Sequence, residues 1–144
     1  MTTETLDVCF LFVYGSLCRD RHDRLHALLQ KDCDYADEAR VPGRLYCLGD
    51  YPGAVFDATE SDDWIYGEVY RLHHPMATFR RLDDYEECSH AYPEPHEYRR
   101  IEKTVTLNQS RGIIAWVYAY NHSLDGLTRI ASGDYRSHQT HTHD

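Results

Sequence analysis

The chain has 144 residues, which is enough for one ordinary domain and too few for two. Its composition, with 42% hydrophobic, 12% aromatic and 27% charged residues, is that of a globular protein. A formal net charge of −9 argues against binding to nucleic acids or to anionic membrane surfaces, because both attract Lys and Arg.

The five cysteines indicate a reducing compartment. Their number is odd, and no pair has CxxC spacing. The longest early apolar run, residues 8–13, is too short for a signal-peptide core or a membrane span. We therefore expect a cytoplasmic protein with reduced thiols. The cysteines are Cys9, Cys18, Cys33, Cys47 and Cys88.

The first half of the chain predicts a strand, a helix and two further strands. Residues 1–6 form a frayed start, and the continuous apolar run 8–13 is typical of a strand buried on both faces. Leucines at helical spacing predict a helix over 19–30. Strands are then expected over 39–48 and 54–56, separated by a turn with Pro and Gly and followed by an acidic loop.

The second half predicts three strands and one helix. A strand over 65–72 contains Gly67, which marks a bulge or a close backbone approach. A helix begins at Pro75, with an apolar stripe through Met76, Phe79 and Leu82. Residues 98–107 alternate as a strand does, with Ile101, Val105 and Leu107 on one face, and the last strand covers 113–120.

Strands outnumber helices, and the two helices are short and far apart. This pattern predicts an α+β fold, in which a small mixed sheet curls into a partial barrel with short helices packed outside. We expect one domain over residues 1–136 and a polar, disordered tail over 137–144.

Glu86 lies at the end of the predicted Pro75 helix and is the first candidate for chemistry. It lies four residues beyond Leu82, so the helix turns it toward the same inward face. Partial desolvation there would raise its pKa, so that one group can both accept and return a proton. Spacing alone favours the simpler alternative of a solvated glutamate among other acids.

The second candidate is the segment Tyr14-Gly15-Ser16-Leu17, where the first strand breaks and leads toward a helix. Successive backbone N–H groups at such a junction can form an anion-binding concavity, and Gly15 permits a close approach. A strand followed by Gly-Ser is more often an ordinary turn, so this segment is weak by itself.

Together these segments resemble the gamma-glutamyl cyclotransferase-like family over roughly residues 8–136. The helix ending Leu82-Asp83-Asp84-Tyr85-Glu86, with Cys88 after it, is most similar to the gamma-glutamylamine cyclotransferase branch. The turn at 51–55 and the Ser-Gly-Asp of 132–134 look more like uncharacterised bacterial members. The other matching stretches are Tyr14-Gly15-Ser16-Leu17, Gly67-Glu68-Val69-Tyr70, Tyr98-Arg99-Arg100 and Ala115-Trp116-Val117-Tyr118-Ala119-Tyr120.

The resemblance implies conversion of a gamma-glutamyl amide into 5-oxoproline and a free amine, without metal or cofactor. The alpha-amine of the substrate attacks its own gamma-carbonyl group. Glu86 would take a proton from this amine and give one to the leaving nitrogen, a role that contributes typically ~10²–10⁴-fold in rate. The small-molecule gamma-glutamyl amide is the only partner that the resemblance implies.

The resemblance also implies a binding site for the glutamyl group. Backbone N–H groups of Gly15, Ser16 and Leu17 would hold its oxygens. Tyr14 would line a pocket tight enough for ring closure. The substrate's polar ends would be oriented by Tyr98, Tyr118 and Tyr135.

Several alternatives remain open. The family often has Gly after the catalytic Glu, whereas Glu87 stands here and either raises the pKa of Glu86 further or marks a divergent pocket. One alternative is a non-catalytic member of the fold that binds a small gamma-glutamyl-like ligand or a protein partner. Another is an enzyme that removes a gamma-glutamyl group within a biosynthetic pathway. Asp83 and Asp84 point in different directions on a helix, which disfavours a glycosidase, and we expect Asp83 to face solvent or cap local structure.

No metal site is expected, because the chain has no HExxH or Cys/His zinc pattern. His138, His141 and His143 belong to the polar tail. His90 and His96 either line the site or are solvated, and the second alternative is favoured. Loops 57–64 and 89–97 would shape the leaving-amine side, where their acidic residues would suit a cationic amine.

Overall fold

The computed structural model describes residues 9–14, 31, 33–48, 52–56, 63–85, 98–108 and 111–135. For Asp84 and Tyr85 it describes the backbone alone. The predicted helix over 19–30, the loop 89–97 and the tail 137–144 lie outside these ranges. The single-domain assignment over 1–136 therefore stays a prediction.

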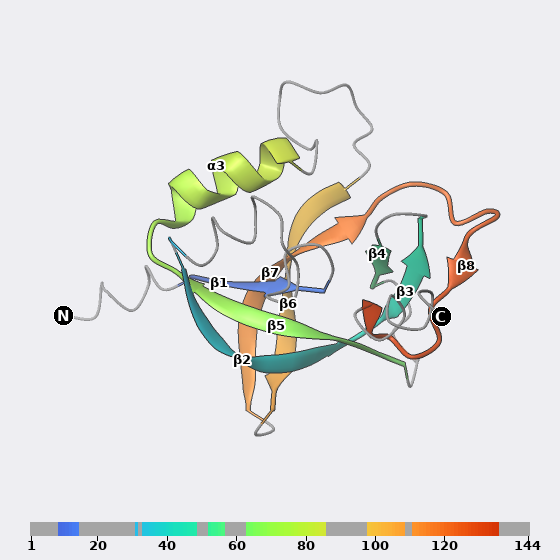
Figure 1. Cartoon of the computed structure of the whole chain (residues 1–144), viewed down its shortest axis with the longest axis horizontal. Helices are drawn as coiled ribbons and strands as arrows, with labels where there is room; N and C mark the ends of the chain where they lie inside the picture. Colours follow the sequence, from blue (N-terminus) through green and yellow to red (C-terminus); the bar gives the residue numbers. More distant parts are fainter. Residues whose placement is uncertain are drawn as a thin grey trace.

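Five strands close into a barrel, in the order β1-β5-β2-β6-β7 (Figure 1). Neighbouring strands are antiparallel except β1 and β7, which are parallel. The prediction of an α+β fold with a mixed sheet curled into a barrel is confirmed. The strands are β1 (Cys9–Val13), β2 (Cys33–Pro42), β5 (Trp64–Leu72), β6 (Tyr98–Leu107) and β7 (Gly112–Tyr120).

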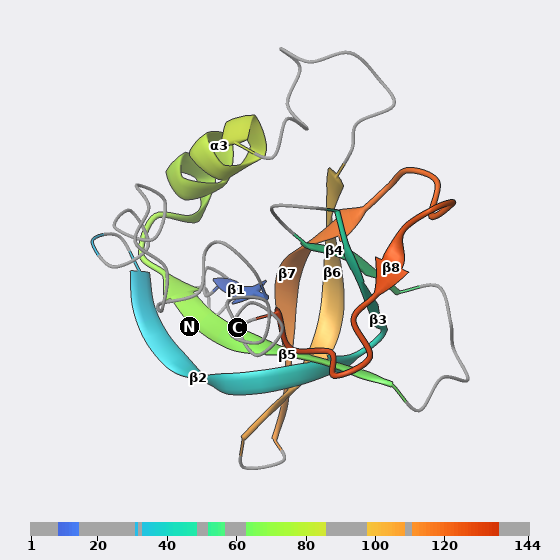
Figure 2. The ribbon, with the colours of Figure 1, turned by 45° about the vertical axis from the view of Figure 1, so that its right-hand side comes forward.

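A second sheet lies beside the barrel, in the order β4-β3-β8 (Figure 2). It contains β3 (Arg44–Cys47), β4 (Pro52–Val55) and β8 (Thr128–Arg129). The prediction of one strand over 39–48 was wrong, because the chain bends at Gly43 and changes sheets there. Pro42, the last residue of β2, has no N–H to continue a ladder.

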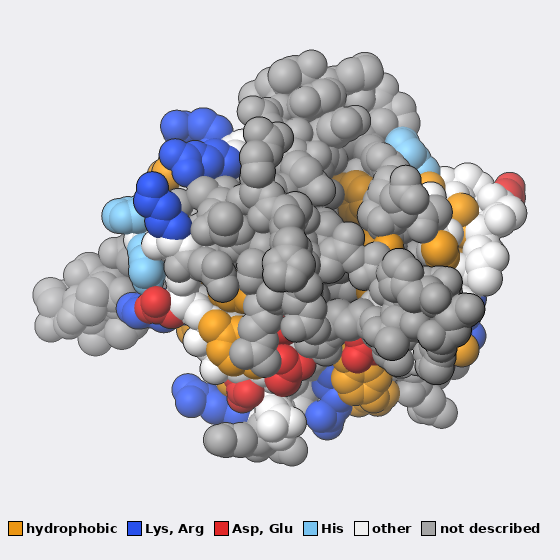
Figure 3. Space-filling model, in the orientation of Figure 1, with side chains coloured by type: hydrophobic (Ala, Val, Ile, Leu, Met, Phe, Trp, Pro, Cys, Tyr) orange, Lys and Arg blue, Asp and Glu red, His pale blue; other side chains and the backbone are white. Residues whose placement is uncertain are grey.

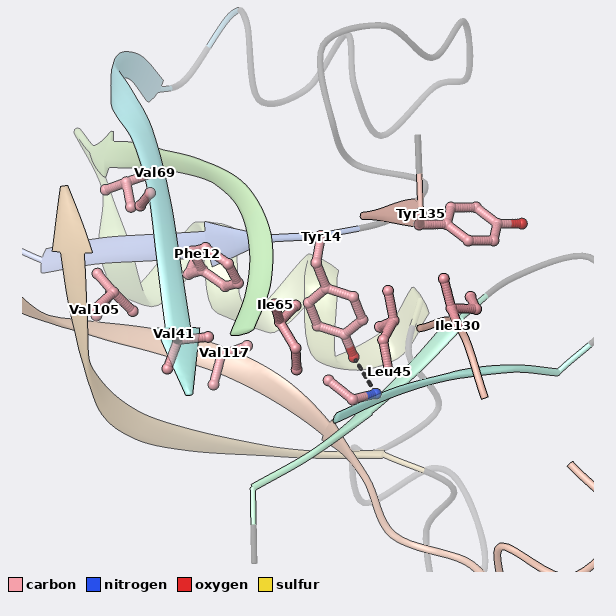
Figure 4. Packing of buried hydrophobic residues seen from close by; sticks show 13 residues of the cluster. Phe12, Tyr14, Val41, Leu45, Ile65, Val69, Val105, Val117, Ile130 and Tyr135 are labelled. Carbon is pink, nitrogen blue, oxygen red and sulfur yellow. Dashed lines mark hydrogen bonds between the residues drawn. The ribbon is translucent and has the colours of Figure 1, made fainter. Parts of the chain in front are cut away.

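Both faces of β1 are buried, which explains why its sequence is apolar without alternation. Phe12 points into the barrel interior and packs against Val69 and Val117 (Figure 4). Leu11 and Val13 belong to a second cluster, which also contains residues of α3. A strand buried on both faces must be apolar at successive positions, as expected for this run.

The helix α3 (Pro75–Tyr85) begins at the predicted residue. Its residues Thr78, Phe79 and Leu82 are buried, whereas Met76 is 79% exposed. The prediction that Met76 faces inward was therefore wrong. Spacings of three residues drift by about 60° per step on a helix of 3.6 residues per turn, so a stripe through 76, 79 and 82 is too wide for one buried face.

Leu82 and Met76 consequently offer a test of the packing of α3. Because Leu82 is fully buried, Leu82→Ala is expected to reduce the free energy of unfolding by about 2–5 kcal/mol. Met76→Ala is the matched control and should change it by less than about 0.5 kcal/mol. Denaturant melts of both variants check this, and equal losses would contradict the observed face of α3.

Gly67 permits a close approach of backbone, as the sequence predicted. A Cβ atom at this position would stand 2.1 Å from the carbonyl oxygen of Val13. The irregularity in register lies instead on the neighbouring strand β2, between Tyr35 and Asp37. Gly67 therefore allows the backbone at the end of β1 to pack closely against β5.

Two further expectations concern membranes and thiols. Within the described ranges, no helix is long and apolar enough to cross a membrane. Cys9, Cys33 and Cys47 carry thiols rather than disulfides. Cys18 and Cys88 lie outside the described residues.

Candidate active site

The structure describes the residues that lead into both candidate sites, Tyr14 on one side and Asp83 on the other. Glu86 and the predicted glutamyl-binding residues Gly15, Ser16 and Leu17 lie outside the described ranges. Tyr14 directly precedes Gly15 at the end of β1, and Asp83 lies in the last turn of α3, three residues before Glu86. The geometry of the site is therefore built from these flanking residues.

Tyr118 on β7 is hydrogen-bonded to both Tyr14 and Asp83. Its backbone carbonyl oxygen accepts a hydrogen bond from the Tyr14 hydroxyl at 2.5 Å. Its own hydroxyl donates to Oδ1 of Asp83 at 2.6 Å. Three residues of chain span about 10–11 Å at full extension, so no chain conformation can separate the Cα atoms of Asp83 and Glu86 by more than that. One residue of β7 thus links the strand that leads into Gly15 with the helix turn that leads into Glu86.

Asp83 is held by a second, stronger partner. Arg100 of β6 donates from Nε to Oδ1 at 2.9 Å and from Nη2 to Oδ2 at 3.0 Å, which is a bidentate ion pair. The expectation that Asp83 faces solvent or caps local structure was wrong, since its side chain is only 20% exposed. Asp83 lies four residues after the buried Phe79, and this spacing turns it toward the barrel.

Aromatic rings fix the orientation of the Arg100 guanidinium group. Its central carbon lies 4.2 Å from the ring centroid of Phe79 and 5.0 Å from that of Trp116. The two rings are themselves edge to face, 5.8 Å apart. Cation–π contacts of this kind favour a guanidinium group over a flexible ammonium group.

Strand β4 is attached to the same end of the barrel. The backbone N–H of Ala54 donates to the Tyr14 hydroxyl at 3.2 Å, a bond drawn in Figure 4. The Tyr98 hydroxyl donates to the carbonyl oxygen of Pro52 at 2.6 Å. Gly53 lets β4 lie directly against β7, because a Cβ there would stand 2.9 Å from the Cβ of Tyr120. Buried tyrosines thus hold the turn segment against the barrel.

The four tyrosines predicted to bind substrate are all buried, with exposures of 3–7%. The structure brings Tyr14, Tyr98 and Tyr118 together at one end of the barrel through the hydrogen bonds just described. Tyr135 packs in the barrel cluster with its hydroxyl directed away from Tyr14 (Figure 4). The assignment of these four as substrate-binding residues stays a prediction.

Sequence reasoning missed Arg100 and Glu68. Arg100 lies two residues after Tyr98 on the same strand, and period-two alternation gives both the same face. Glu68 is fully buried, and the Tyr70 hydroxyl donates to its Oε1 at 3.1 Å. The register pairs Glu68 with Val13, just before Tyr14.

The described residues contain no group of three or more His, Cys, Asp or Glu that could hold a metal ion. Nε2 of His73 lies 2.9 Å from Oδ2 of Asp34. The tail histidines, together with His90 and His96, lie outside the described ranges.

Comparisons of the sequence point to one family. The family model described as gamma-glutamyl cyclotransferase, AIG2-like, matches residues 11–137. The chain is 33% identical over 131 residues to the putative gamma-glutamylcyclotransferase YkqA of Bacillus subtilis, covering 90% of this chain and 42% of that protein. It is 33% identical over 126 residues to the gamma-glutamylcyclotransferase family protein YtfP of Escherichia coli K12, covering 87% of this chain and 94% of that one.

Solved structures share the fold. The crystal structure of YkqA from Bacillus subtilis superposes with a TM-score of 0.72 at 29% identity, covering 94% of this chain and 42% of that chain. An AIG2-like protein from Mus musculus superposes with a TM-score of 0.61 at 20% identity, covering 83% and 90% of the two chains. The chain thus spans less than half of YkqA and nearly all of YtfP.

Proposed function

We propose that this chain, which belongs to the gamma-glutamyl cyclotransferase, AIG2-like family, converts a gamma-glutamyl amide into 5-oxoproline and a free amine. Membership confirms the family that the sequence motifs indicated. A cyclotransferase-type activity follows from that membership, and the finer features below are proposals.

The proposed reaction is an intramolecular aminolysis that consumes no water. The alpha-ammonium group loses a proton, and the resulting amine attacks the gamma-carbonyl carbon to form the ring C–N bond. The tetrahedral intermediate then collapses, and the bond from that carbon to the leaving nitrogen breaks. The ring nitrogen loses its second proton, the leaving nitrogen gains two, and the carbonyl oxygen stays in the lactam.

We assign the proton transfers to Glu86. A carboxylate can take the first proton from the alpha-ammonium group and, once protonated, give it to the leaving nitrogen. The same group can relay the second proton. Backbone N–H groups of Gly15, Ser16 and Leu17 would hold the glutamyl oxygens and stabilise negative charge on the attacked carbonyl.

The observation that best supports this assignment is the pair of hydrogen bonds at Tyr118. They connect the residue before Gly15 with a residue three positions before Glu86. The two segments are 70 residues apart in the sequence, counting from Ser16 to Glu86. Their flanking residues nevertheless meet at one position of β7, as a catalytic group and its binding loop require.

The proposed reaction leaves the identity of the leaving amine open. The Leu-Asp-Asp-aromatic-Glu motif favours a gamma-glutamylamine, in which the amine is the side chain of lysine or a polyamine. Gamma-glutamyl amino acids, glutathione and a biosynthetic intermediate share the same reacting atoms. The alternative from another class is a non-catalytic member of the fold that binds a gamma-glutamyl-like ligand or a protein, and the retained Glu86 argues against it.

A substrate panel tests the proposal. Purified protein is incubated with gamma-glutamyl-epsilon-lysine, a gamma-glutamyl polyamine, gamma-glutamyl amino acids and glutathione, and 5-oxoproline is quantified by mass spectrometry. Release from one class supports the proposal and identifies the leaving amine. A folded protein that releases none would refute it, and retained binding of the panel by calorimetry would then favour the non-catalytic alternative.

A further inference from the structure

We infer that Asp83 is a positioning residue of the proposed cyclisation: held by Arg100 and Tyr118, it fixes the last turn of α3, from which the chain leads to Glu86. The inference rests on the proposed function. It concerns a carboxylate that acts through another residue and does not itself touch the substrate.

Three hydrogen bonds restrain the carboxylate of Asp83. Oδ1 accepts from the Tyr118 hydroxyl and from Nε of Arg100, and Oδ2 accepts from Nη2 of Arg100. A bidentate guanidinium fork sets the plane of the carboxylate, and the hydroxyl supplies a bond from a second strand. These three bonds join α3 to both β6 and β7.

The partners of Asp83 are themselves fixed. Arg100 is contacted by Phe79 from α3 and by Trp116 from β7. The side chain of Tyr118 is 4% exposed, and its backbone carbonyl receives the Tyr14 hydroxyl. The carboxylate is therefore anchored to groups that cannot easily follow a displaced helix end.

At this end of the helix, the side chain of Asp83 is bonded to two strands of the barrel. Arg80 and Arg81 are exposed, and basic side chains gather over α3 on the face shown in Figure 3. Leu82 supplies burial, which is not directional. Asp83 adds directional bonds in the last turn of the helix, three residues before Glu86 in the sequence. A misplacement of about 1 Å at a reacting group can reduce the rate about 10²-fold, so such bonds matter for turnover.

A positioning role and a binding role for this cluster differ in kinetics. Loss of a group that binds substrate equally in the ground and transition states raises KM and leaves kcat unchanged. Loss of a group that aligns the proton-transfer residue lowers kcat with little change in KM. The Tyr118 hydroxyl is a predicted substrate contact and also a donor to Asp83. Its removal therefore raises KM if substrate binding dominates and lowers kcat if positioning dominates.

The test uses Asp83→Asn and Tyr118→Phe in the full chain, with the preferred substrate of the panel. We expect Asp83→Asn to lower kcat about 10–100-fold and Tyr118→Phe about 3–10-fold, with KM within about threefold of the parent. The double variant should lose less than the product of the two single losses, because both changes act on the contacts of one side chain. Asp83→Glu, which keeps a carboxylate acceptor, should recover part of kcat.

Asp34→Asn is the matched control, because it breaks a solvent-exposed carboxylate pair with His73 away from this cluster. It should leave kcat unchanged. Circular dichroism and thermal melts confirm that each variant is folded at the assay temperature. Should Asp83→Asn fail to fold, Tyr118→Phe, which removes a single oxygen, decides the question.

Two results would overturn the inference alone: a kcat within threefold of the parent in folded Asp83→Asn, or a raised KM with unchanged kcat. An Asp34→Asn variant that loses as much activity would do the same. Absence of 5-oxoproline release by the parent protein would instead refute the proposed function, and the inference would fall with it.

Discussion

Glu86→Gln is expected to lower 5-oxoproline release about 10²–10⁴-fold while the melting temperature changes by no more than a few degrees. Glutamine has nearly the shape of glutamate and keeps an acceptor oxygen, but it cannot take a proton from the alpha-ammonium group or return one to the leaving nitrogen. The measurement is the initial rate of release from the preferred substrate at saturating concentration.

The adjacent acid provides the control for this prediction. Glu87→Gln makes the same chemical change one residue further along and is expected to retain most of the parent activity. Turnover within a few-fold of the parent in Glu86→Gln would remove Glu86 from the mechanism. Loss of turnover only in Glu87→Gln would assign the chemistry to the neighbouring residue.

Gly67→Ala is expected to reduce the stability of the fold strongly. The added Cβ would stand 2.1 Å from the carbonyl oxygen of Val13 and 3.0 Å from its carbonyl carbon. Because these are backbone atoms, β1 or β5 must shift, and the expected loss is about 3 kcal/mol or more of the free energy of unfolding. The displacement falls at the end of β1, so we also expect activity to decrease.

Gly112→Ala is the glycine control for that experiment. Its added Cβ would have ordinary contacts, the nearest being 3.6 Å from Cγ2 of Thr104. Denaturant melts should place this variant within about 0.5 kcal/mol of the parent. Equal stability of the Gly67→Ala variant and the parent would mean that β1 does not approach β5 as closely as described.

Local patterns predicted four of the five barrel strands because β1, β5, β6 and β7 each carry their own signal, whereas the first half of β2 was missed. The unbroken apolar run of β1, the alternation of β6 and the Pro75 start of α3 are all readable within about ten residues. The second sheet was missed since β8 has only two residues and β3 continues the β-like sequence of β2. Which sheet a strand joins depends on partners distant in sequence.

In the candidate site too, local motifs were predicted and contacts between distant residues were not. Motifs selected Glu86 and the segment after Tyr14, which carry the proposed chemistry, from short stretches of sequence. They did not reveal Arg100 as the partner of Asp83, because that ion pair joins residues 17 positions apart on different elements. The spacing of four from Phe79 to Asp83 was the available signal, and the focus on adjacent acids in the helix obscured it.

Isotope incorporation from the solvent tests the central claim of intramolecular cyclisation most directly. The preferred substrate is turned over in water enriched in ¹⁸O, and the products are analysed by mass spectrometry. The proposed reaction consumes no water, so 5-oxoproline should form without ¹⁸O above the level of an enzyme-free control. Glutamate carrying one ¹⁸O in its side-chain carboxylate would show that water is the nucleophile and would contradict the proposal.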